Sequence, residues 1–492
     1  MYLSRRRLLG SLALGAGAVV LAACGQSSSS TPAAAPAKPA EPAKPAEAAK
    51  PAESKPAAPA AAGAPTSAPA AAAPAKPADS GPVTINVIAW NSGSSAEAFK
   101  NAMAGINDKF KATKPNVTIN FEPLGQGPTW TNAQMSRIAG QTADVTATYG
   151  FAPQDIINFQ PDSQFIELTG IDSIKNFDQT NVKRFMTWKG KVWQLTLSYV
   201  GHLVWTNEDM LAKYNLKAPT TYAEWNAMCD TLKSNKEQPI FLAAKPQTAL
   251  SRLASQAEMT IGRPKHPNFF PDMIVRGKAD FTTPEWVESF KRAKDFIKAF
   301  VDPAFSGIDY PTGAGLFATG KYAMWPEGSF SGGDIMAAKP TYQKLGAFNA
   351  TFGDDKDANA VQPVYGDLGW AGLRYSKNAG VVTDWINFFG QKENFVSFMQ
   401  VLQYYPTQPD AKLTGPVPEA EAPLLKKTAV SQNRLGLPGM TFDTNWGEFL
   451  LSDQYTPESF AAYYQKNWED SRPQWQKYIG MFDDEWAKLY FS

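Results

Sequence analysis

Apolar and polar residues alternate with the period of a strand near residue 83 and with the period of a helix soon afterwards. Residues 83–89 (VTINVIA) alternate around β-branched side chains, which predicts a short strand. The segment 94–97 (SSAE) is a capping box, and apolar residues follow it at helical spacing: Phe99, Met103, Ile106 and Phe110. Pro115 ends this helix, and residues 117–121 (VTINF) predict a second strand. The order predicts a right-handed βαβ unit with a parallel pair of strands.

Aromatic residues stand where two of these strands end. A third strand is predicted at residues 144–149. In parallel sheets the ligand crevice lies at the carboxyl ends of the strands. The residues that close the first and third strands are therefore expected to face a crevice: Trp90, Asn91, Tyr149, Gly150 and Phe151. The alternative for a single ring, Trp90 or Phe151, is that it caps the core beneath a loop.

Two later patterns predict helices that serve the core. Each begins with Thr-Pro-Glu, at residues 283–285 and 456–458, which places proline in the first turn. The first helix has an apolar stripe of core residues: Val287, Phe290, Ala293, Ile297 and Val301. We expect three tryptophans of the C-terminal part to be packing residues: Trp468, Trp475 and Trp486.

The first 23 residues have the pattern of an export signal. A positive cluster precedes an apolar run of 16 residues, from Leu8 to Ala23, which is short for a membrane core of about 30 Å. The run ends in residues 21–25 (LAACG), which resemble a bacterial lipobox, so we expect Cys24 to be lipidated. Cleavage without lipidation is the alternative. Arg5 and Arg6 resemble the twin-arginine signal, and Sec export remains open.

Residues 24–81 form the expected lipidated cysteine and tether. Beyond Cys24, this segment consists almost wholly of Ala, Pro, Ser, Lys and Glu, with no aromatic residue and no Leu, Ile or Val. Such a composition does not offset the entropy of ordering, so we expect disorder with polyproline II character. At about 3.1 Å per residue the tether would reach well over 100 Å. A proline-rich docking motif is the alternative.

Composition excludes several classes of function. There are 47 Lys and Arg against 46 Asp and Glu, a net charge of +1, which gives no electrostatic case for nucleic acid. The chain has two histidines, His202 and His266, and two distant cysteines, Cys24 and Cys229. These numbers argue against a zinc site or a disulfide framework, so no metal and no cofactor is expected. Aromatic rings are abundant instead, with 14 Trp, 17 Tyr and 29 Phe.

The order of short motifs over residues 83–406 resembles the extracellular solute-binding protein family 1, the carbohydrate-type receptors of ABC importers. The motifs are FKATKPNV at 110–117, ADV at 143–145, FIELT at 165–169, WKGKVWQL at 188–195, VWTNEDML at 204–211, APTTYAEW at 218–225 and LFATGKYAM at 316–324. Thr196, Trp205-Thr206 and 325–327 (WPE) depart from the family pattern, so the resemblance predicts the fold and the class of ligand rather than one particular sugar.

The resemblance implies an α/β fold of the periplasmic binding protein-like II type, with two lobes and a hinge that the chain crosses several times. Residues 82–492 number 411, which also suggests two lobes. The expected crossings lie near 199–202, near Gly346 and near 404–410. The expected divisions are the first lobe at 82–200, the second lobe at 201–345, a return to the first lobe at 346–405, and C-terminal helices of the second lobe at 406–492.

By this resemblance the chain would capture a small neutral solute, a mono- or oligosaccharide, and deliver it to an ABC permease. Ligand contact with both lobes would close the hinge. The protein would be a monomer, held at the outer face of the bacterial cell membrane by the lipid on Cys24. Sugars stack on rings and bond to short polar groups. The expected ligand-binding residues are Trp90, Asn91, Tyr149, Gly150, Phe151, Tyr199, Trp325, Glu327, Ser329, Phe330 and Trp370.

Other functions remain open from the sequence. A secreted glycosidase would need two carboxylates about 5 to 10 Å apart; Glu327 is one candidate and no motif indicates a second. A receptor for a polyol, polyamine, peptide or metal chelate is also possible. Asp144, Glu327 and Asp367 would suit a polyamine, and the pair at 404–405 (YY) would suit a ferric chelate. We expect that pair to be a helix end near a hinge, His202 to be packed, and Cys229 to be a buried thiol.

Overall fold

The computed structural model describes residues 81–90, 96–125, 127–245, 248–339, 344–425, 429–431, 437–438, 446–447, 449–450 and 453–491. All of these residues belong to one of the two units of the chain, Lys76–Ser492. The export signal with Arg5 and Arg6, the lipidation site Cys24, the tether and Asn91 lie outside the described residues. Among the helices that the structure describes, none combines the length and the hydropathy of a membrane-spanning segment.

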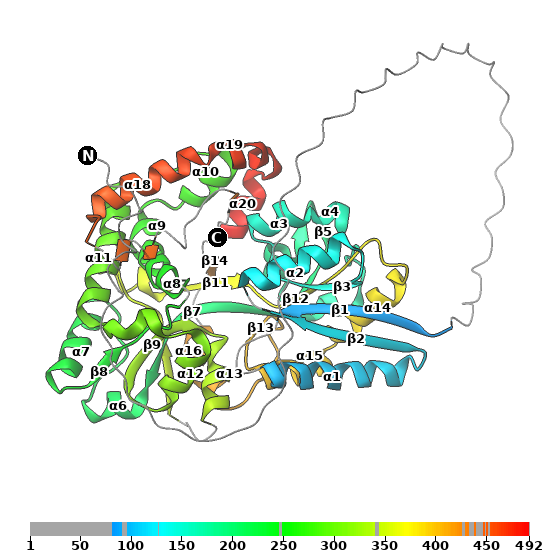
Figure 1. The fold of residues 1–492 in the computed structure, drawn as a ribbon, viewed down its shortest axis with the longest axis horizontal. Coiled ribbons are helices and arrows are strands. Elements are labelled where there is room, and N and C mark those ends of the chain that lie inside the picture. The colour runs from blue at the N-terminus through cyan, green and yellow to red at the C-terminus, as the bar shows by residue number, and fades with distance from the viewer. Residues whose placement is uncertain are drawn as a thin grey trace, which may run out of the picture. The chain divides into compact units, whose positions relative to one another are not determined.

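A five-stranded sheet is the centre of the first lobe, in the order β2, β1, β3, β12, β6 (Figure 1). β1 is parallel to β2 and β3, whereas β12 is antiparallel to β3. Because α1 connects β1 to β2, the predicted βαβ unit is confirmed. The bounds of the strands are β1 Val83–Trp90, β2 Val117–Leu124, β3 Val145–Thr148, β6 Leu195–Thr196 and β12 Gly369–Gly372.

Helices bury their apolar stripes against this sheet. The four apolar positions predicted in α1, from Phe99 to Phe110, are buried, and α1 packs beside α15 (Figure 1). A small hairpin of β4 (Thr187–Trp188) and β5 (Lys191–Val192) belongs to the same lobe. The bounds of the helices are α1 Ala96–Thr113, α2 Gly127–Ala139, α3 Pro153–Phe159, α4 Pro161–Gln164, α5 Gln179–Asn181, α14 Ala379–Phe389 and α15 Lys392–Leu402.

A seven-stranded sheet is the centre of the second lobe, in the order β14, β11, β7, β9, β8, with β10 and β13 also paired to β7. β8 is parallel to β9, so the carboxyl ends of these two strands lie at the same edge. The bounds of the strands are β7 Ser198–Asn207, β8 Gln238–Ile240, β9 Tyr322–Gly328, β10 Leu345–Phe348, β11 Gln362–Gly366, β13 Tyr405–Pro406 and β14 Ala429–Ser431.

The helices of the second lobe include both that were predicted from Thr-Pro-Glu. α11 begins at Pro284, and α18 begins at Pro457 behind a capping box of Thr456 and Ser459. The bounds are α6 Glu208–Lys213, α7 Tyr222–Ser234, α8 Thr248–Ala257, α9 Arg263–Lys265, α10 Phe269–Arg276, α11 Pro284–Phe300, α12 Tyr310–Ala318, α13 Ser331–Ala338, α16 Pro416–Leu425, α18 Pro457–Asp470 and α19 Arg472–Trp475.

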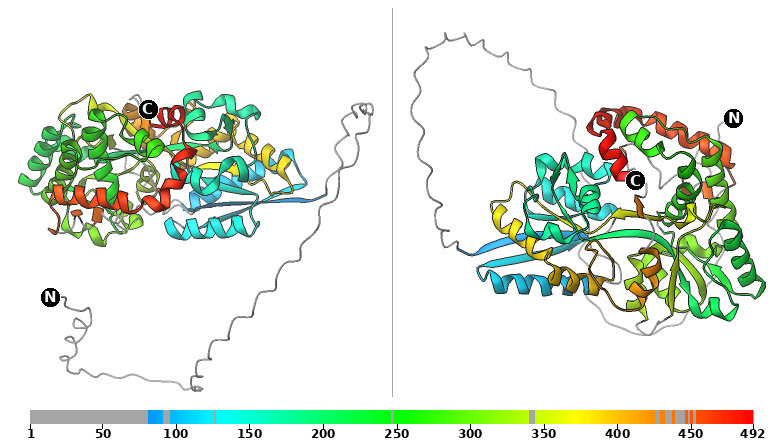
Figure 2. Two further views of the ribbon diagram at one scale, coloured as in Figure 1. Left: turned by 90° about the horizontal axis from the view of Figure 1, so that it is seen from above. Right: turned by 180° about the vertical axis from the view of Figure 1, so that it is seen from behind.

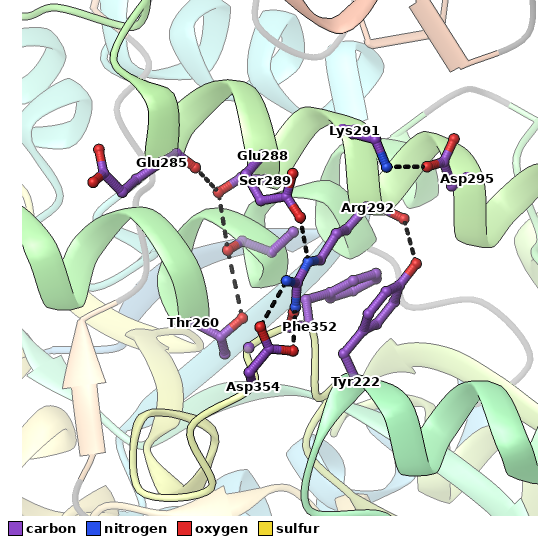
Figure 3. A network of polar contacts seen from close by, with 12 residues as sticks. Tyr222, Thr260, Glu285, Glu288, Ser289, Lys291, Arg292, Asp295, Phe352 and Asp354 are labelled. Atoms are coloured by element: carbon purple, nitrogen blue, oxygen red, sulfur yellow. Dashed lines mark hydrogen bonds and ion pairs between the residues drawn. The ribbon is translucent and has the colours of Figure 1, made fainter.

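Arg292 of α11 joins three segments of the second lobe (Figure 3). Its guanidinium donates to Asp354 through two nitrogens at 2.7 Å each, to Glu288 at 2.7 Å and to the carbonyl of Phe352 at 2.8 Å. The hydroxyl of Tyr222 in α7 donates to the carbonyl of Arg292 at 3.4 Å. The hydrogen bonds to Arg292 lower the pKa of Asp354. This bidentate geometry fixes α11 against the segment that follows β10.

The long strand β7 links the two parts of the second sheet. Its first residues pair with β13 and β11, at Tyr199↔Tyr405 and Val200↔Tyr365, whereas its later residues pair with β9 and β10. The expected crossing at 199–202 lies in this strand, and the expected crossing at 404–410 contains β13.

The expected crossing near Gly346 is wrong in its position. Gly346 pairs with Thr206 inside the second sheet, and after β10 the chain next changes sheet between Gly366 of β11 and Gly369 of β12. A Cβ at position 346 would lie 2.1 Å from Oε1 of Glu208 and 2.5 Å from Oγ1 of Thr206, so a larger residue there would have to displace these two side chains. Close packing, and not a change of lobe, explains this residue.

The C-terminal helix α20 (Asp484–Phe491) contacts both lobes, although the sequence placed residues 406–492 with the second lobe (Figure 2). In the second lobe, Arg276 donates to both carboxylate oxygens of Asp484 at 2.7 and 2.8 Å, and Phe270 stacks on Phe491 with centroids 5.8 Å apart. In the first lobe, the ring of Trp188 lies 5.9 Å from that of Trp486, and the ring of Phe185 lies 6.3 Å from that of Tyr490. Nε of Arg184 also donates to the carbonyl of Leu489 at 3.2 Å.

The tryptophans expected to pack the C-terminal part are buried. Trp468 and Trp475 stack at 4.0 Å with an interplanar angle of 13°, and each is 1% exposed. Trp486 is 9% exposed and stacks on Tyr490 at 5.0 Å.

Candidate ligand-binding site

A pair of parallel rings lies where β1 and β3 end. The rings of Trp90 and Tyr149 have centroids 4.6 Å apart and planes 7° apart, and both side chains are half-buried. Trp130 of α2 is buried and meets Trp90 edge-on at 5.8 Å. The two strands are parallel neighbours, so their carboxyl ends bring these rings together. We call Trp90, Tyr149 and Trp130 the first-lobe platform.

Two glycines join this platform to the second sheet. The amide of Gly150 donates to the carbonyl of Gly366 at 2.9 Å. A Cβ on Gly150 would lie 2.5 Å from the Cα of Gly366, and a Cβ on Gly366 would lie 2.4 Å from the Cα of Gly150. Gly366 pairs with Tyr199 of β7, so the end of β3 touches the backbone of the second sheet. Only glycine allows this approach of two backbones.

We expect Gly150→Ala to lower the free energy of unfolding by about 1–3 kcal/mol, as overpacking of a tight contact does. The added methyl group would meet backbone atoms of Gly366, which no rotamer change can move. Urea unfolding measures the effect. Gly105→Ala is the matched control, since a Cβ at Gly105 in α1 would have nothing within 4 Å. Equal stability of the two variants would contradict the importance of the contact.

A charged pair lies at the carboxyl edge of β8 and β9 in the second lobe. Glu327 is the next-to-last residue of β9, and Arg252 belongs to α8, which follows β8. Nη1 of Arg252 donates to Oε1 of Glu327, and the amide of Gly328 donates to the same oxygen at 3.0 Å. The guanidinium carbon of Arg252 lies 5.5 Å from the centroid of the Phe330 ring. The side chain of Glu327 is 1% exposed, whereas that of Arg252 is 28% exposed.

Burial and attraction oppose each other in this pair. Burial raises the pKa of Glu327, and Arg252 and the Gly328 amide only partly offset that effect. Burial also lowers the pKa of Arg252, but the attraction of Glu327 and other groups outweighs it, so the net pKa is raised. Asp334 of α13 is buried nearby and accepts a hydrogen bond from Tyr310. The pair and Asp334 form a polar group beside the ring of Phe330.

Three of the rings that the sequence assigned to the ligand lie in the core instead. Trp325, Phe151 and Trp370 are each 0% exposed. Trp325 stacks on Phe241 with centroids 5.4 Å apart, Trp370 packs against Trp385 at 5.5 Å, and the amide of Phe151 donates to Phe185 at 3.2 Å. These three rings pack in the core. Their burial disagrees with the expectation that they stack on a ligand.

Two further residues connect strands of the second sheet. Ser329 accepts from the amide of Gly201 at 3.2 Å and donates its own amide to Gly201 at 2.8 Å, which ties the end of β9 to β7. Tyr199 is half-buried and meets Tyr405 edge-on at 5.8 Å. Burial raises the pKa of Tyr199 to about 12. Ser329, which follows β9, thus bonds to β7, whereas Tyr199 belongs to β7 and is only half-buried.

The candidates for other chemistry are buried or engaged. Glu327 is enclosed with Arg252, and Tyr405 is 0% exposed. Burial raises the pKa of the Cys229 thiol, and His202 is 4% exposed with its ring 5.7 Å from that of Tyr365. Within the part of the chain that the structure describes, no three His, Cys, Asp or Glu residues gather as a metal site would require.

Sequence reasoning missed two residues of this site. Trp130 lies inside α2, where its periodicity reads as an ordinary core position. Arg252 stands between buried residues of α8, so the only available signal was a single charge inside the largely apolar run at 250–254 (LSRLA).

Two α/β lobes whose sheets meet at Gly150 and Gly366, with a cluster of rings and a charged pair at their strand ends, are the architecture of a two-lobe binding protein. The family model of the bacterial extracellular solute-binding protein matches residues 106–426. The chain belongs to this family, and the fold expected from the sequence is confirmed.

Solved structures with this fold resemble the chain over most of its length. A chitin oligosaccharide binding protein has a TM-score of 0.68 at 19% identity, and the match covers 80% of this chain and 99% of that one. RafE in complex with raffinose has a TM-score of 0.65 at 16% identity, covering 78% and 99%. Maltose-bound MalE3 of T. maritima has a TM-score of 0.62 at 15% identity, covering 79% and 99%. No curated protein matches by sequence.

Proposed function

We propose that this solute-binding protein captures a neutral saccharide between its two lobes. The observation that carries the proposal is the stacked pair of Trp90 and Tyr149, half-buried at adjacent strand ends and joined to the second lobe through Gly150 and Gly366. The C–H face of a sugar stacks on such rings. The described neighbours bound to raffinose and to maltose support a saccharide ligand.

Capture would shift the protein toward the state in which both lobes contact the ligand. A ligand shifts such an equilibrium only by its difference in affinity for the two states. The strands β7, β11 and β13 connect the lobes and are the natural axis of that motion. We infer that an ABC permease receives the ligand-bound form, and that the protein acts as a monomer.

The N-terminal segment supports a position outside the cytoplasm, as the family description also does. We infer that residues 1–23 direct export through the twin-arginine signal at Arg5 and Arg6, and that Cys24 carries the lipid. Residues 25–81 would then let the binding lobes move at a distance from the membrane. Two lipid signals or several acyl chains are needed for durable anchoring.

Binding without turnover is the function that the site supports. A glycosidase would need two accessible carboxylates across the substrate. Glu327 is 1% exposed and bonded to Arg252, and its neighbour Asp334 is also buried. If product accumulated when the protein was incubated with oligosaccharides, a glycosidase would be the better interpretation. A polyol or polyamine ligand would be detected in a thermal-shift screen that includes these compounds.

A thermal-shift screen tests the proposal directly. Residues 82–492 would be screened against raffinose, maltose, a chitin oligosaccharide, polyols, amino acids and polyamines. A ligand that binds only the folded state raises Tm. At a concentration 100 times Kd, it increases the free energy of unfolding by about 2.7 kcal/mol. A rise with a saccharide supports the proposal, and a rise with polyamines alone would contradict it.

We expect Trp90→Ala to weaken binding of the saccharide found in that screen by about 1–3 kcal/mol, which corresponds to about 5- to 150-fold in Kd. The loss follows from removal of one stacked ring of the first-lobe platform. Calorimetric titration measures Kd. Trp370→Phe is the control, because Trp370 is fully buried against Trp385 and should change stability but not affinity. Unchanged affinity for Trp90→Ala would exclude the platform.

A further inference from the structure

The charged pair of the second lobe offers only one of its members to a ligand. The side chain of Arg252 is 28% exposed, whereas that of Glu327 is 1% exposed. The second carboxylate oxygen of Glu327 is buried and has no hydrogen-bond partner among the described residues. A ligand that approaches this edge of the sheet would therefore meet the side chain of Arg252 and not the carboxylate of Glu327.

Glu327 and Phe330 hold the guanidinium in one orientation. Oε1 of Glu327 accepts from Nη1 of Arg252 and is itself fixed by the amide of Gly328 at 3.0 Å. The ring of Phe330 lies 5.5 Å from the guanidinium carbon. Within the residues that the structure describes, the other N–H groups of Arg252 donate to no protein acceptor. A planar guanidinium with several donors still available suits a pair of neighbouring oxygen acceptors.

Tyr365, next to the point where the second sheet meets the platform, belongs to the electrostatic surroundings of Arg252. Tyr365 is close enough to Arg252 to affect its pKa, and the next residue, Gly366, bonds to Gly150 at 2.9 Å. Tyr149 of the platform directly precedes Gly150. Tyr365 and Gly366 thus connect the surroundings of Arg252, along the chain and through one hydrogen bond, to Gly150 next to the platform.

We propose that Arg252 is the specificity-determining residue of the second lobe, donating hydrogen bonds to two neighbouring hydroxyl oxygens of the saccharide, and that Glu327 positions it without contacting the ligand. This inference rests on the proposed function. It changes the role of Glu327, which the sequence suggested as a direct contact. A guanidinium has no acceptor, so the ligand must present oxygen lone pairs there.

The charges around Arg252 favour a neutral ligand over an acidic one. Glu327 bonds to it, and Asp334 is the next acid in the same group, while Tyr310 and Tyr365 are the remaining titratable neighbours. The group therefore contains one cation and two acidic side chains, of which Glu327 bonds to Arg252 and Asp334 acts on Glu327. A uronic acid would gain little here, because its carboxylate would also be repelled by Glu327 and Asp334.

Calorimetric titration of four variants tests the inference, with raffinose, maltose, a chitin oligosaccharide and a uronic-acid disaccharide as probes. We expect Arg252→Gln to weaken binding of the neutral saccharide at least tenfold, and Arg252→Lys to restore part of that loss. Glu327→Gln should weaken binding less. The double variant Arg252→Gln with Glu327→Gln should match Arg252→Gln alone, because a positioning residue has no effect once its partner is gone.

The double variant also guards against misfolding, since it leaves no unpaired charge in the buried site. Arg472→Gln is the matched control, because Arg472 lies over Trp475 at 5.4 Å in the C-terminal helices. Wild-type affinity in Arg252→Gln would overturn the inference and leave the proposed function standing. A further loss on adding Glu327→Gln, or tighter binding of the uronic-acid disaccharide, would also overturn it. No binding of any saccharide by the wild type would overturn both proposals.

Discussion

Glu258→Gln is expected to stabilise the protein at pH 8 by on the order of 3–5 kcal/mol, because a carboxylate is buried there without compensation. Glu258 lies in the π-helical turn Glu258–Gly262, is 4% exposed, and has a carboxylate oxygen with no partner among the described residues. Burial raises the pKa of Glu258 to about 8. Glutamine keeps the shape of the neutral acid and cannot ionise.

The sign of the pH dependence follows from the raised pKa. Between about pH 4.5 and pH 8 the folded protein holds a proton at Glu258 that the unfolded chain releases, so stability falls as pH rises. Glu258→Gln should remove that slope and match the wild type near pH 4. Urea unfolding over this pH range measures it. Glu285→Gln is the control, since the hydrogen bond to His266 lowers the pKa of Glu285. Parallel pH curves for the wild type and Glu258→Gln would contradict the prediction.

Trp486→Ala is expected to lower the free energy of unfolding by about 3–5 kcal/mol, as loss of a buried tryptophan does. The indole of Trp486 is 9% exposed and packs on Tyr490 in the same helix and on Trp188 of the first lobe. Its removal takes away the ring contact between α20 and Trp188 of that lobe. Chemical denaturation gives the loss of stability.

Hydrogen exchange separates the loss of a contact between lobes from a general loss of stability. In Trp486→Ala we expect faster exchange at residues 182–188 as well as in α20, because α20 covers them. Trp475→Ala is the matched control: Trp475 is 1% exposed and stacks on Trp468 within the C-terminal helices. Trp475→Ala should lower the free energy of unfolding by a similar amount without selectively speeding hydrogen exchange at residues 182–188. Equal exchange in both variants would contradict a bridging role for α20.

Local periodicity was sufficient for the elements that begin the fold. The βαβ unit from Val83 to Phe121 could be predicted because each element is defined by neighbours in sequence. The meeting of Trp90 and Tyr149 could also be predicted, since parallel strands that pair end at one edge. The starts of α11 and α18 followed from proline in the first turn.

Features that depend on which way a side chain points could not be predicted in this way. Trp325 and Glu327 lie two residues apart in β9 and so share a face, but only the tertiary packing shows that Phe241 covers the first and Arg252 the second. Trp370 lies within β12 and is covered by Trp385. The crossing near Gly346 was expected from the family resemblance alone, and no local pattern distinguishes such a crossing from the close contact with Glu208 and Thr206 that the structure shows there.

The attachment of α20 to both lobes has a consequence for their motion. Strands β7, β11 and β13 form one connection, and α20 forms a second, so rotation about the strands must also disturb one side of the helix. The aromatic side, with Trp188 and Trp486, is held by buried surface, whereas the Arg276–Asp484 pair is 41% and 53% exposed. Dissolved ions screen an exposed pair but not a buried ring. The ease with which the lobes separate should therefore depend on ionic strength, a property set by the medium outside the cell.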